Sequence, residues 1–222
     1  MRIGVTIFPG SNCDRDALSA LHRVGAEPVE LWHADADLKS VDAVFVPGGF
    51  SYGDYLRPGA IARFSAVMGP LEEFARDGGP VIGVCNGFQV LTEAHLLPGA
   101  LLQNTSTRFI GSRARVRVES ADTPWTSGCE EGAELTLPVA HNEGNYYADA
   151  DTLTRLEDEN RVVLRYVENP NGSANDIAGV CNEARNVVGV MPHPERASDP
   201  VLGSEDGLCI LRSILQKAGA NV

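Results

Sequence analysis

The stretch Val81-Ile82-Gly83-Val84-Cys85-Asn86-Gly87-Phe88-Gln89 sets one cysteine between two glycines, directly after a short apolar run. The apolar run predicts a buried strand, and the residues after Cys85 can form a helix. A strand, a G-x-C-x-G turn and a helix are the pattern of a nucleophile elbow, with cysteine in the place of serine. Gly83 and Gly87 make room around the sharp turn, so we expect the Cys85 thiol to stand exposed above the carboxyl end of a sheet. The alternative is a buried core thiol beside incidental glycines.

Short apolar runs and amphipathic stretches alternate on either side of this motif. In the first half, the strand candidates are residues 3–8, 28–32, 41–46 and 81–84, separated by helical stretches. This order predicts an α/β fold with a mostly parallel central sheet and helices on both faces. In the second half, strand candidates follow one another at residues 113–119, 135–140, 162–167, 177–181 and 187–191. We expect them to extend the same sheet as antiparallel strands, within one domain over residues 1–222.

The composition excludes several classes of partner. The 222 residues carry 18 Lys and Arg against 30 Asp and Glu, a formal net charge of −12. So acidic a chain repels phosphate backbones and anionic lipid, which excludes nucleic acid and membrane surfaces. No apolar run reaches the ~20 residues of a membrane span, and the start reads as a strand with no signal peptide. A G-x-x-x-x-G-K-[ST] phosphate loop is also missing.

The five cysteines are Cys13, Cys85, Cys129, Cys181 and Cys209. Their odd number and irregular spacing argue against a disulfide framework. Cysteine and histidine do not cluster at zinc-ligand spacing, so we expect no metal site. The pattern favours a reduced, cytoplasmic protein with mostly buried thiols. Cys13 is the rival nucleophile, because it also follows a strand and begins a helix, but it lacks the flanking glycines of an elbow.

A thiol nucleophile needs a base and a group that orients the base. His193 and Glu195 lie in Met191-Pro192-His193-Pro194-Glu195-Arg196, directly after a predicted strand. Two residues apart in an extended segment, their side chains can point the same way. Glu195 can then accept a hydrogen bond from the imidazole and fix its tautomer. His141, at the end of another strand, is the alternative base.

Attack on a carbonyl also needs an oxyanion hole. The backbone N–H of Asn86, directly after the nucleophile, is one candidate donor. The second donor is expected from the long loop between Pro47 and Gly59, at the end of a neighbouring strand. Large side chains in this loop, Tyr52, Asp54 and Arg57 among them, have no role in hydrolysis alone. Because Tyr and Arg anchor interfaces, we expect this loop to contact a partner.

Together these residues resemble the class I, triad-type glutamine amidotransferases. The stretches 10–14, 47–57, 87–91, 138–144, 169–173 and 191–196 are similar to the glutaminase subunits of phosphoribosylformylglycinamidine synthase, and this resemblance runs nearly end to end. It implies the same α/β fold and a Cys85-His193-Glu195 triad that hydrolyses L-glutamine through a γ-glutamyl thioester. It also implies Gly49 and Asn86 as oxyanion donors. Substrate-binding roles are implied for Gln89 and, more weakly, for Glu143, Gly144, Asn145 and Tyr146.

The resemblance further implies where the ammonia goes. It would be passed to a synthetase subunit for ATP-dependent conversion of formylglycinamide ribonucleotide to the amidine, in de novo purine synthesis. A small third subunit would bridge the two chains. This chain would need no cofactor, since ATP and Mg²⁺ would belong to the synthetase. A glutaminase for another synthetase, a cysteine-elbow peptidase or chaperone, and a glutamine sensor without turnover are the alternatives.

Overall fold

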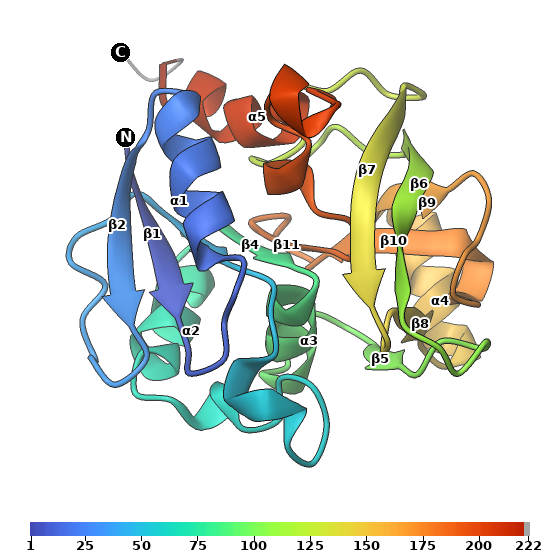
Figure 1. The fold of residues 1–222 in the computed structure, drawn as a ribbon, viewed down its shortest axis with the longest axis horizontal. Helices are drawn as coiled ribbons and strands as arrows, with labels where there is room; N and C mark the ends of the chain where they lie inside the picture. The colour runs from blue at the N-terminus through green and yellow to red at the C-terminus, as the bar shows by residue number, and fades with distance from the viewer. Residues whose placement is uncertain (220–222) are drawn as a thin grey trace.

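A nine-stranded mixed sheet forms the centre of the computed structural model, which describes residues 1–219 (Figure 1). Residues 220–222, the end of the predicted domain, lie outside the described range. The sheet has the order β2-β1-β3-β4-β11-β10-β9-β6-β7. Its strands are β1 (Arg2–Ile7), β2 (Glu27–Trp32), β3 (Ala43–Val46), β4 (Val81–Val84), β6 (Ile110–Val118), β7 (Glu134–His141), β9 (Val162–Tyr166), β10 (Ile177–Cys181) and β11 (Val187–Val190).

Strands β2, β1, β3, β4 and β11 are parallel neighbours, as the sequence predicts. Figure 1 shows helix α1 (Asp14–Arg23) in front of β1 and β2, and helix α2 (Met68–Arg76) behind them. Right-handed crossovers that run in opposite directions along a sheet place their helices on opposite faces. The chain crosses from β1 outward to β2 and later from β3 inward to β4, so both faces are covered. The predicted α/β class is confirmed.

Strands from the second half of the chain complete the sheet as antiparallel neighbours. β11 pairs with β4 in parallel on one side and with β10 antiparallel on the other. β9, β6 and β7 then continue the antiparallel order. The predicted antiparallel extension is therefore confirmed for β10, β9, β6 and β7, whereas β11 belongs to the parallel part of the sheet. Because β11 returns to the middle of the sheet, the chain segment that follows it emerges beside the segment that follows β4.

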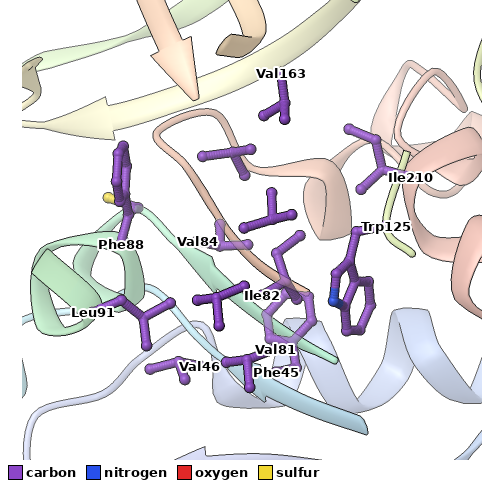
Figure 2. Packing of buried hydrophobic residues seen from close by; sticks show 14 of the residues in the cluster. Phe45, Val46, Val81, Ile82, Val84, Phe88, Leu91, Trp125, Val163 and Ile210 are labelled. Carbon is purple, nitrogen blue, oxygen red and sulfur yellow. The ribbon is translucent and has the colours of Figure 1, made fainter. Parts of the chain in front are cut away.

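The core lies against the central strands (Figure 2). All four residues of β4 are buried, because helices cover both faces of the parallel strands. Phe45 of β3 meets Trp125 edge to face, with ring centroids 6.4 Å apart. Helix α3 (Asn86–Glu93) follows the elbow and buries Phe88 and Leu91 against this core. The elbow is thus held between a buried strand and a buried helix.

The strands β5 (Ala100–Leu102) and β8 (Asn145–Tyr147) and the helix α4 (Ala150–Asp158) were not predicted from the sequence. β5 and β8 form a separate two-stranded sheet, too short to leave an alternating pattern. Helix α4 is capped by Asp149, which accepts a hydrogen bond of 2.8 Å from the Thr152 N–H. Helix α5 (Leu208–Gly219) ends the described chain. Within the described residues, none of the helices combines the length and the apolar character needed to cross a membrane.

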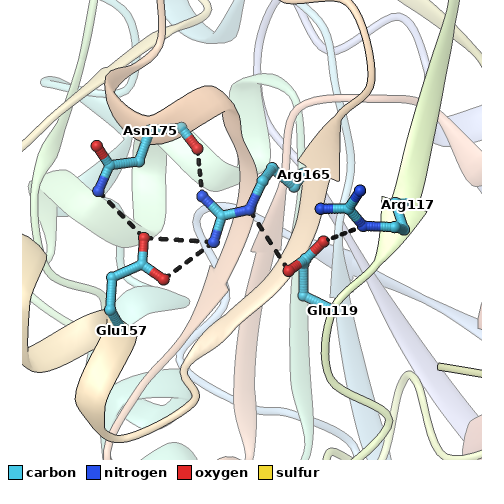
Figure 3. A network of polar contacts seen from close by, with 5 residues as sticks. All are labelled: Arg117, Glu119, Glu157, Arg165 and Asn175. Atoms are coloured by element: carbon cyan, nitrogen blue, oxygen red, sulfur yellow. Dashed lines mark hydrogen bonds and ion pairs between the residues drawn. The ribbon is translucent and has the colours of Figure 1, made fainter. Parts of the chain in front are cut away.

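A network of charged side chains holds β6, β9 and α4 together (Figure 3). Arg165 on β9 lies between two carboxylates, at 3.5 Å from Glu119 and 3.0 Å from Glu157. Arg117 on β6 reaches Glu119 at 2.5 Å, and Asn175 donates to Glu157 at 3.1 Å. Polar contacts therefore help to join the antiparallel part of the sheet to its covering helix.

One disulfide corrects the expectation of free thiols. Cys129 and Cys209 are bonded across 80 residues, between the loop before β7 and the first turn of α5. Their spacing carries no recognisable signature, because the fold alone brings the loop and the helix together. Cys13, Cys85 and Cys181 are free and buried.

Candidate active site

Cys85 occupies a strained turn between β4 and α3. Its φ of 52° and ψ of −107° lie outside the regions that side chains normally adopt. The flanking glycines are required, since a Cβ on Gly87 would lie 1.9 Å from the Val46 carbonyl oxygen and one on Gly83 2.6 Å from the Gly87 carbonyl oxygen. The thiol is 5% exposed, which is less than predicted, because β7 covers it. Its Sγ donates to the Ala140 carbonyl oxygen at 3.6 Å.

His193 and Glu195 form a buried pair just beyond β11. His193 Nδ1 lies 2.5 Å from Glu195 Oε1, and each residue is 1% exposed. Burial lowers the pKa of His193, but the Glu195 carboxylate and the Cys85 thiol raise it, and the pKa lies well above its usual value. The other ring nitrogen, Nε2, has no hydrogen-bond partner among the described residues. This ring is therefore oriented through Nδ1 and free at Nε2.

The sheet brings the nucleophile and the histidine together. Val84 of β4 pairs with Val190 of β11, so the segments that leave these two strands start side by side. Gly48, in the segment after β3, is a neighbour of both Cys85 and His193. A Cβ placed on Gly48 would lie 3.4 Å from the Cys85 Cβ and 2.7 Å from His193 Cε1. Cys85, His193 and Glu195 thus form one constellation at the carboxyl ends of adjacent parallel strands, where open α/β sheets hold their ligands.

The two predicted oxyanion donors belong to the segments that follow β4 and β3. Asn86 is the first residue of α3, so its N–H is one of the helix donors without an intrahelical acceptor. Gly49 has a φ of 139° and forms a bridge with Ser11 of the loop after β1. A Cβ on Gly49 would lie 2.7 Å from the Asn12 backbone nitrogen. Only glycine fits this close approach of two loops.

Gln89 and Glu143 are connected by a hydrogen bond. The Gln89 amide donates to the Glu143 carbonyl oxygen at 2.6 Å and accepts from Asn86 Nδ2 at 2.9 Å. Asn86 Oδ1 in turn accepts from the Ser51 N–H at 3.1 Å. The side chains of Asn86 and Gln89 therefore join the elbow helix to the loops on both sides of it.

The other predicted substrate-binding residues form hydrogen bonds to other parts of the chain. Tyr146 is 1% exposed, and its hydroxyl donates to the Pro98 carbonyl oxygen at 2.9 Å. Asn145 Nδ2 donates to the Gln103 carbonyl oxygen at 3.3 Å. The Gly144 N–H donates to Asn104 Oδ1 at 3.0 Å. The structure thus shows these residues holding the loop after β7, and their contact with substrate stays a prediction.

Three side chains of the loop after β3 were predicted to face a partner, and Tyr52 is one of them. The Tyr52 hydroxyl is turned inward, 2.7 Å from His33 Nδ1 and 2.8 Å from Ser65 Oγ. It therefore braces the loop, and its contact with a partner stays a prediction. Asp54 is half-buried, and burial, with the nearby Glu143 carboxylate, raises its pKa to about 6. The outward side chains are Tyr55, which is 74% exposed, and Leu56, which is 88% exposed.

The alternative base, His141, is buried and held by a hydrogen bond. It is 3% exposed, and its Nδ1 lies 3.1 Å from Asn104 Oδ1. Burial and the nearby His193 lower its pKa to about 4. Among the described residues, it has no carboxylate partner comparable to the Glu195 partner of His193.

Cys13 is a member of the site that sequence reasoning set aside. Its thiol accepts a hydrogen bond of 3.1 Å from Arg196 Nη2, and Arg196 also binds Asp16 at 2.9 Å. Burial raises the pKa of Cys13 above its usual value, although the His193 ring and Arg196 act to lower it. A cavity of about 140 Å³ adjoins these groups, lined by Asn12, Cys13, Gly49, Phe50, Phe109, Ala140, His193 and Arg196. Only the fold reveals this position, since Cys13 and His193 are far apart in the chain.

Comparisons with known proteins agree on one kind of relative. A sequence model of the CobB/CobQ-like glutamine amidotransferase domain matches residues 1–205. A phosphoribosylformylglycinamidine synthase subunit PurQ of Rubrobacter xylanophilus is 78% identical over 222 residues, which cover 100% of each chain. The protein of the same name in Streptomyces avermitilis is 57% identical over 227 residues, covering 97% of each chain.

Solved structures agree with these sequences. The structure of PurLQS from Thermotoga maritima contains a chain that is 46% identical, with a TM-score of 0.91 and 98% of each chain covered. A putative GMP synthase subunit from Thermoplasma acidophilum is only 16% identical, with a TM-score of 0.66 over 100% of this chain and 95% of the other. The second likeness concerns the fold alone.

Proposed function

The chain belongs to the PurQ family of phosphoribosylformylglycinamidine synthase subunits, and we propose that Cys85, His193 and Glu195 are its catalytic triad. Its function is that of the glutaminase subunit of this synthase, in purine biosynthesis. The observation that carries the residue assignment is the convergence of the strained Cys85 elbow with the buried His193–Glu195 pair. The rival nucleophile, Cys13, has no such strained turn, with a φ of −103°.

Each member of the triad has a defined step. Cys85 Sγ attacks the side-chain amide carbon of glutamine and forms a γ-glutamyl thioester, while His193 Nε2 takes the thiol proton. His193 then gives that proton to the departing ammonia and next takes one from the water that cleaves the thioester. Glu195 accepts the Nδ1–H bond and stabilises the charged imidazole, which agrees with the raised pKa of His193.

The tetrahedral oxyanion would lie between two backbone donors. The N–H of Asn86 is available at the start of α3, and Gly49 follows Gly48, where an added Cβ would lie 3.4 Å from the Cys85 Cβ. Fixed backbone donors stabilise charge without rearranging during the reaction. Gln89 supports this arrangement by fixing the Glu143 carbonyl and the Asn86 side chain. We assign Gln89 to positioning the substrate-binding loop, together with Gly144.

The ammonia is consumed on other subunits. The chain works in a complex with a synthetase and a small bridging subunit. We assign ATP and Mg²⁺ to the synthetase, because this sequence has no phosphate loop and a net charge of −12. We place the complex in the cytoplasm, where its biosynthetic reaction belongs.

The loop from Phe50 to Pro58 is proposed to contact the synthetase. Its exposed Tyr55 and Leu56 lie on the same segment as Gly49. Phe50 N–H donates to the Gly10 carbonyl oxygen at 3.0 Å, so movement of this segment would reach the oxyanion position directly. Docking that favours the competent loop conformation would restrain wasteful hydrolysis in the free chain.

The test of the triad separates glutamine hydrolysis from synthesis. In the reconstituted complex, Cys85→Ala should abolish glutamine-dependent synthesis and leave synthesis from ammonium salts largely intact. Cys181→Ser is a matched control, because Cys181 is a buried free thiol in β10. Retained glutamine-dependent turnover in Cys85→Ala would move the nucleophile elsewhere.

A further inference from the structure

We propose that the Cys129–Cys209 disulfide is a site of thiol–disulfide exchange with a dithiol reductant, and that its reduction lowers the glutaminase activity of the chain. The bond joins two segments that lie 80 residues apart in the sequence. Cys129 lies in the loop before β7, and Cys209 is the second residue of α5. Neither cysteine belongs to the proposed triad, so the pair has no step of its own in glutamine hydrolysis.

The turn that leads into α5 packs against the segment that carries Glu195. In this turn, the Gly207 N–H donates to the Ala197 carbonyl oxygen at 2.8 Å. A Cβ on Gly207 would lie 2.0 Å from the Pro194 carbonyl oxygen, so the two backbones are in direct contact. Pro194 stands between His193 and Glu195. Movement of this turn would therefore displace the residues that hold the catalytic imidazole.

The same turn is also bonded to β7. The Thr136 N–H of this strand donates to Asp206 Oδ2 at 2.7 Å. Two residues further along β7, the Pro138 carbonyl oxygen accepts a hydrogen bond of 2.8 Å from the His193 N–H. The turn before α5 thus contacts both of the backbone segments that hold His193 in place.

The disulfide ties the start of α5 to the loop before β7. One turn further along the helix, Ser213 Oγ accepts a hydrogen bond of 2.8 Å from the Gly128 N–H of the same loop. A covalent link restricts the conformations that two segments can adopt, and cleavage removes that restriction. We therefore expect the start of α5 to open locally more often in the reduced chain than in the oxidised chain.

A reductant can approach the bond from a cavity of about 480 Å³ that borders Cys209 and Gly128. One thiolate of a dithiol attacks the Cys209 sulfur and releases Cys129, and the second thiol of the dithiol then releases Cys209. Two electrons and two protons pass to the two cysteines, and the dithiol becomes a disulfide. Disulfides of cytoplasmic proteins are mostly transient or redox-sensing, which agrees with such an exchange.

The effect on activity rests on the proposed function of the triad, but the exchange itself does not. Exchange is tested on the full-length chain in glutathione buffers of stepped ratio, with thiols trapped by alkylation after unfolding and counted by mass spectrometry. We expect three thiols in the oxidised chain and five in the reduced chain, with Cys129 and Cys209 changing together. The control Cys181→Ser should keep this transition. Five thiols in every buffer, or a pair that stays bonded in the folded chain under excess dithiothreitol, would overturn the exchange site.

Activity is tested by treating this chain alone, desalting it and then reconstituting the complex. Reduction should lower glutamine-dependent synthesis about tenfold, because small misplacements of catalytic groups are costly, and leave synthesis from ammonium salts unchanged. Reoxidation should restore the rate.

Cys129→Ser should match the reduced wild type and gain nothing from reoxidation, which separates this bond from oxidation of Cys85. The reduced wild type gives the same comparison if that variant folds poorly. Equal glutamine-dependent rates in oxidised and reduced wild type would overturn the regulatory role, as would a matching loss of synthesis from ammonium salts. Cys85→Ala tests the triad separately, so a failure of the switch and a failure of the proposed function are distinguishable.

Discussion

Arg57 binds Glu93 through two hydrogen bonds of 2.6 Å, one from Nε to Oε1 and one from Nη2 to Oε2. This contact joins the exposed loop after β3 to the last residue of helix α3. The first residue of the same short helix follows Cys85. A partner that moves the loop would therefore act on the elbow from both ends of α3.

Arg57→Ala should weaken activation by the synthetase. We expect coupled glutamine turnover to fall about tenfold, within the range of ordinary coupling energies. The reaction of Cys85 in the free chain with a glutamine-like alkylating reagent should change little, because the triad itself is untouched. Arg76→Ala, at the exposed end of α2, is the control. Unchanged partner affinity together with unchanged coupled turnover would contradict this role.

The buried pair His193–Glu195 predicts two substitutions of unequal severity. His193→Ala removes the base and should lower glutamine-dependent turnover by at least about 10⁴-fold. Glu195→Gln removes charge and orientation but keeps the base, so its loss should be about a hundredfold milder. Steady-state rates in the complex, with ammonium salts as the reference substrate, measure both. Two equally mild losses would argue that another group acts as the base, with His141 tested next.

Sequence patterns located the elbow, the His-x-Glu segment and the parallel strands because each depends on local spacing. Gly83 and Gly87 directly indicate a tight turn at Cys85, and the prolines on either side of His193 indicate an extended segment. Which thiols meet was not predictable, since Cys13 approaches His193 only when β1 and β11 enter one sheet. The same holds for the bond between Cys129 and Cys209, which depends on where α5 packs.

The direction in which a side chain points was the second feature that the sequence alone did not predict. Tyr52 has the residue type of an interface anchor, yet its hydroxyl is bound between His33 and Ser65. Tyr146 has a type suited to substrate binding, yet it packs against Phe88 in the core. Large aromatic residues serve packing and recognition equally well, so their type alone does not distinguish the two.

Asp54 should make stability depend on pH. Burial and Glu143 raise its pKa from 3.8 to about 6, so the folded chain holds this proton more tightly than the unfolded chain. Stability from this group is therefore lost as pH rises from about 4 to about 6. Because Asp54 is half-exposed, Asp54→Asn should raise the free energy of unfolding by only about 1 kcal/mol at pH 8, and not at pH 4.

Chemical denaturation at several pH values measures this difference for Asp54. A free-energy difference between Asp54→Asn and wild type that stays constant from pH 4 to pH 8 would mean that Asp54 does not titrate in this range with a raised pKa.

Two glycine-to-alanine substitutions should distinguish the effect of crowding at the elbow from the effect of helix propensity. Gly87 and Gly69 both lie near the start of a helix. A Cβ on Gly87 would lie 1.9 Å from the Val46 carbonyl oxygen, which belongs to the backbone and cannot move aside. A Cβ on Gly69 would have no atom outside α2 within 4 Å. Gly87→Ala should therefore cost about 3 kcal/mol of unfolding free energy and slow alkylation of Cys85. Gly69→Ala should gain about 0.5–1 kcal/mol, as alanine does in helices, and leave alkylation unchanged. If Gly87→Ala kept wild-type stability and wild-type alkylation, the tight elbow would not be what presents the Cys85 thiol.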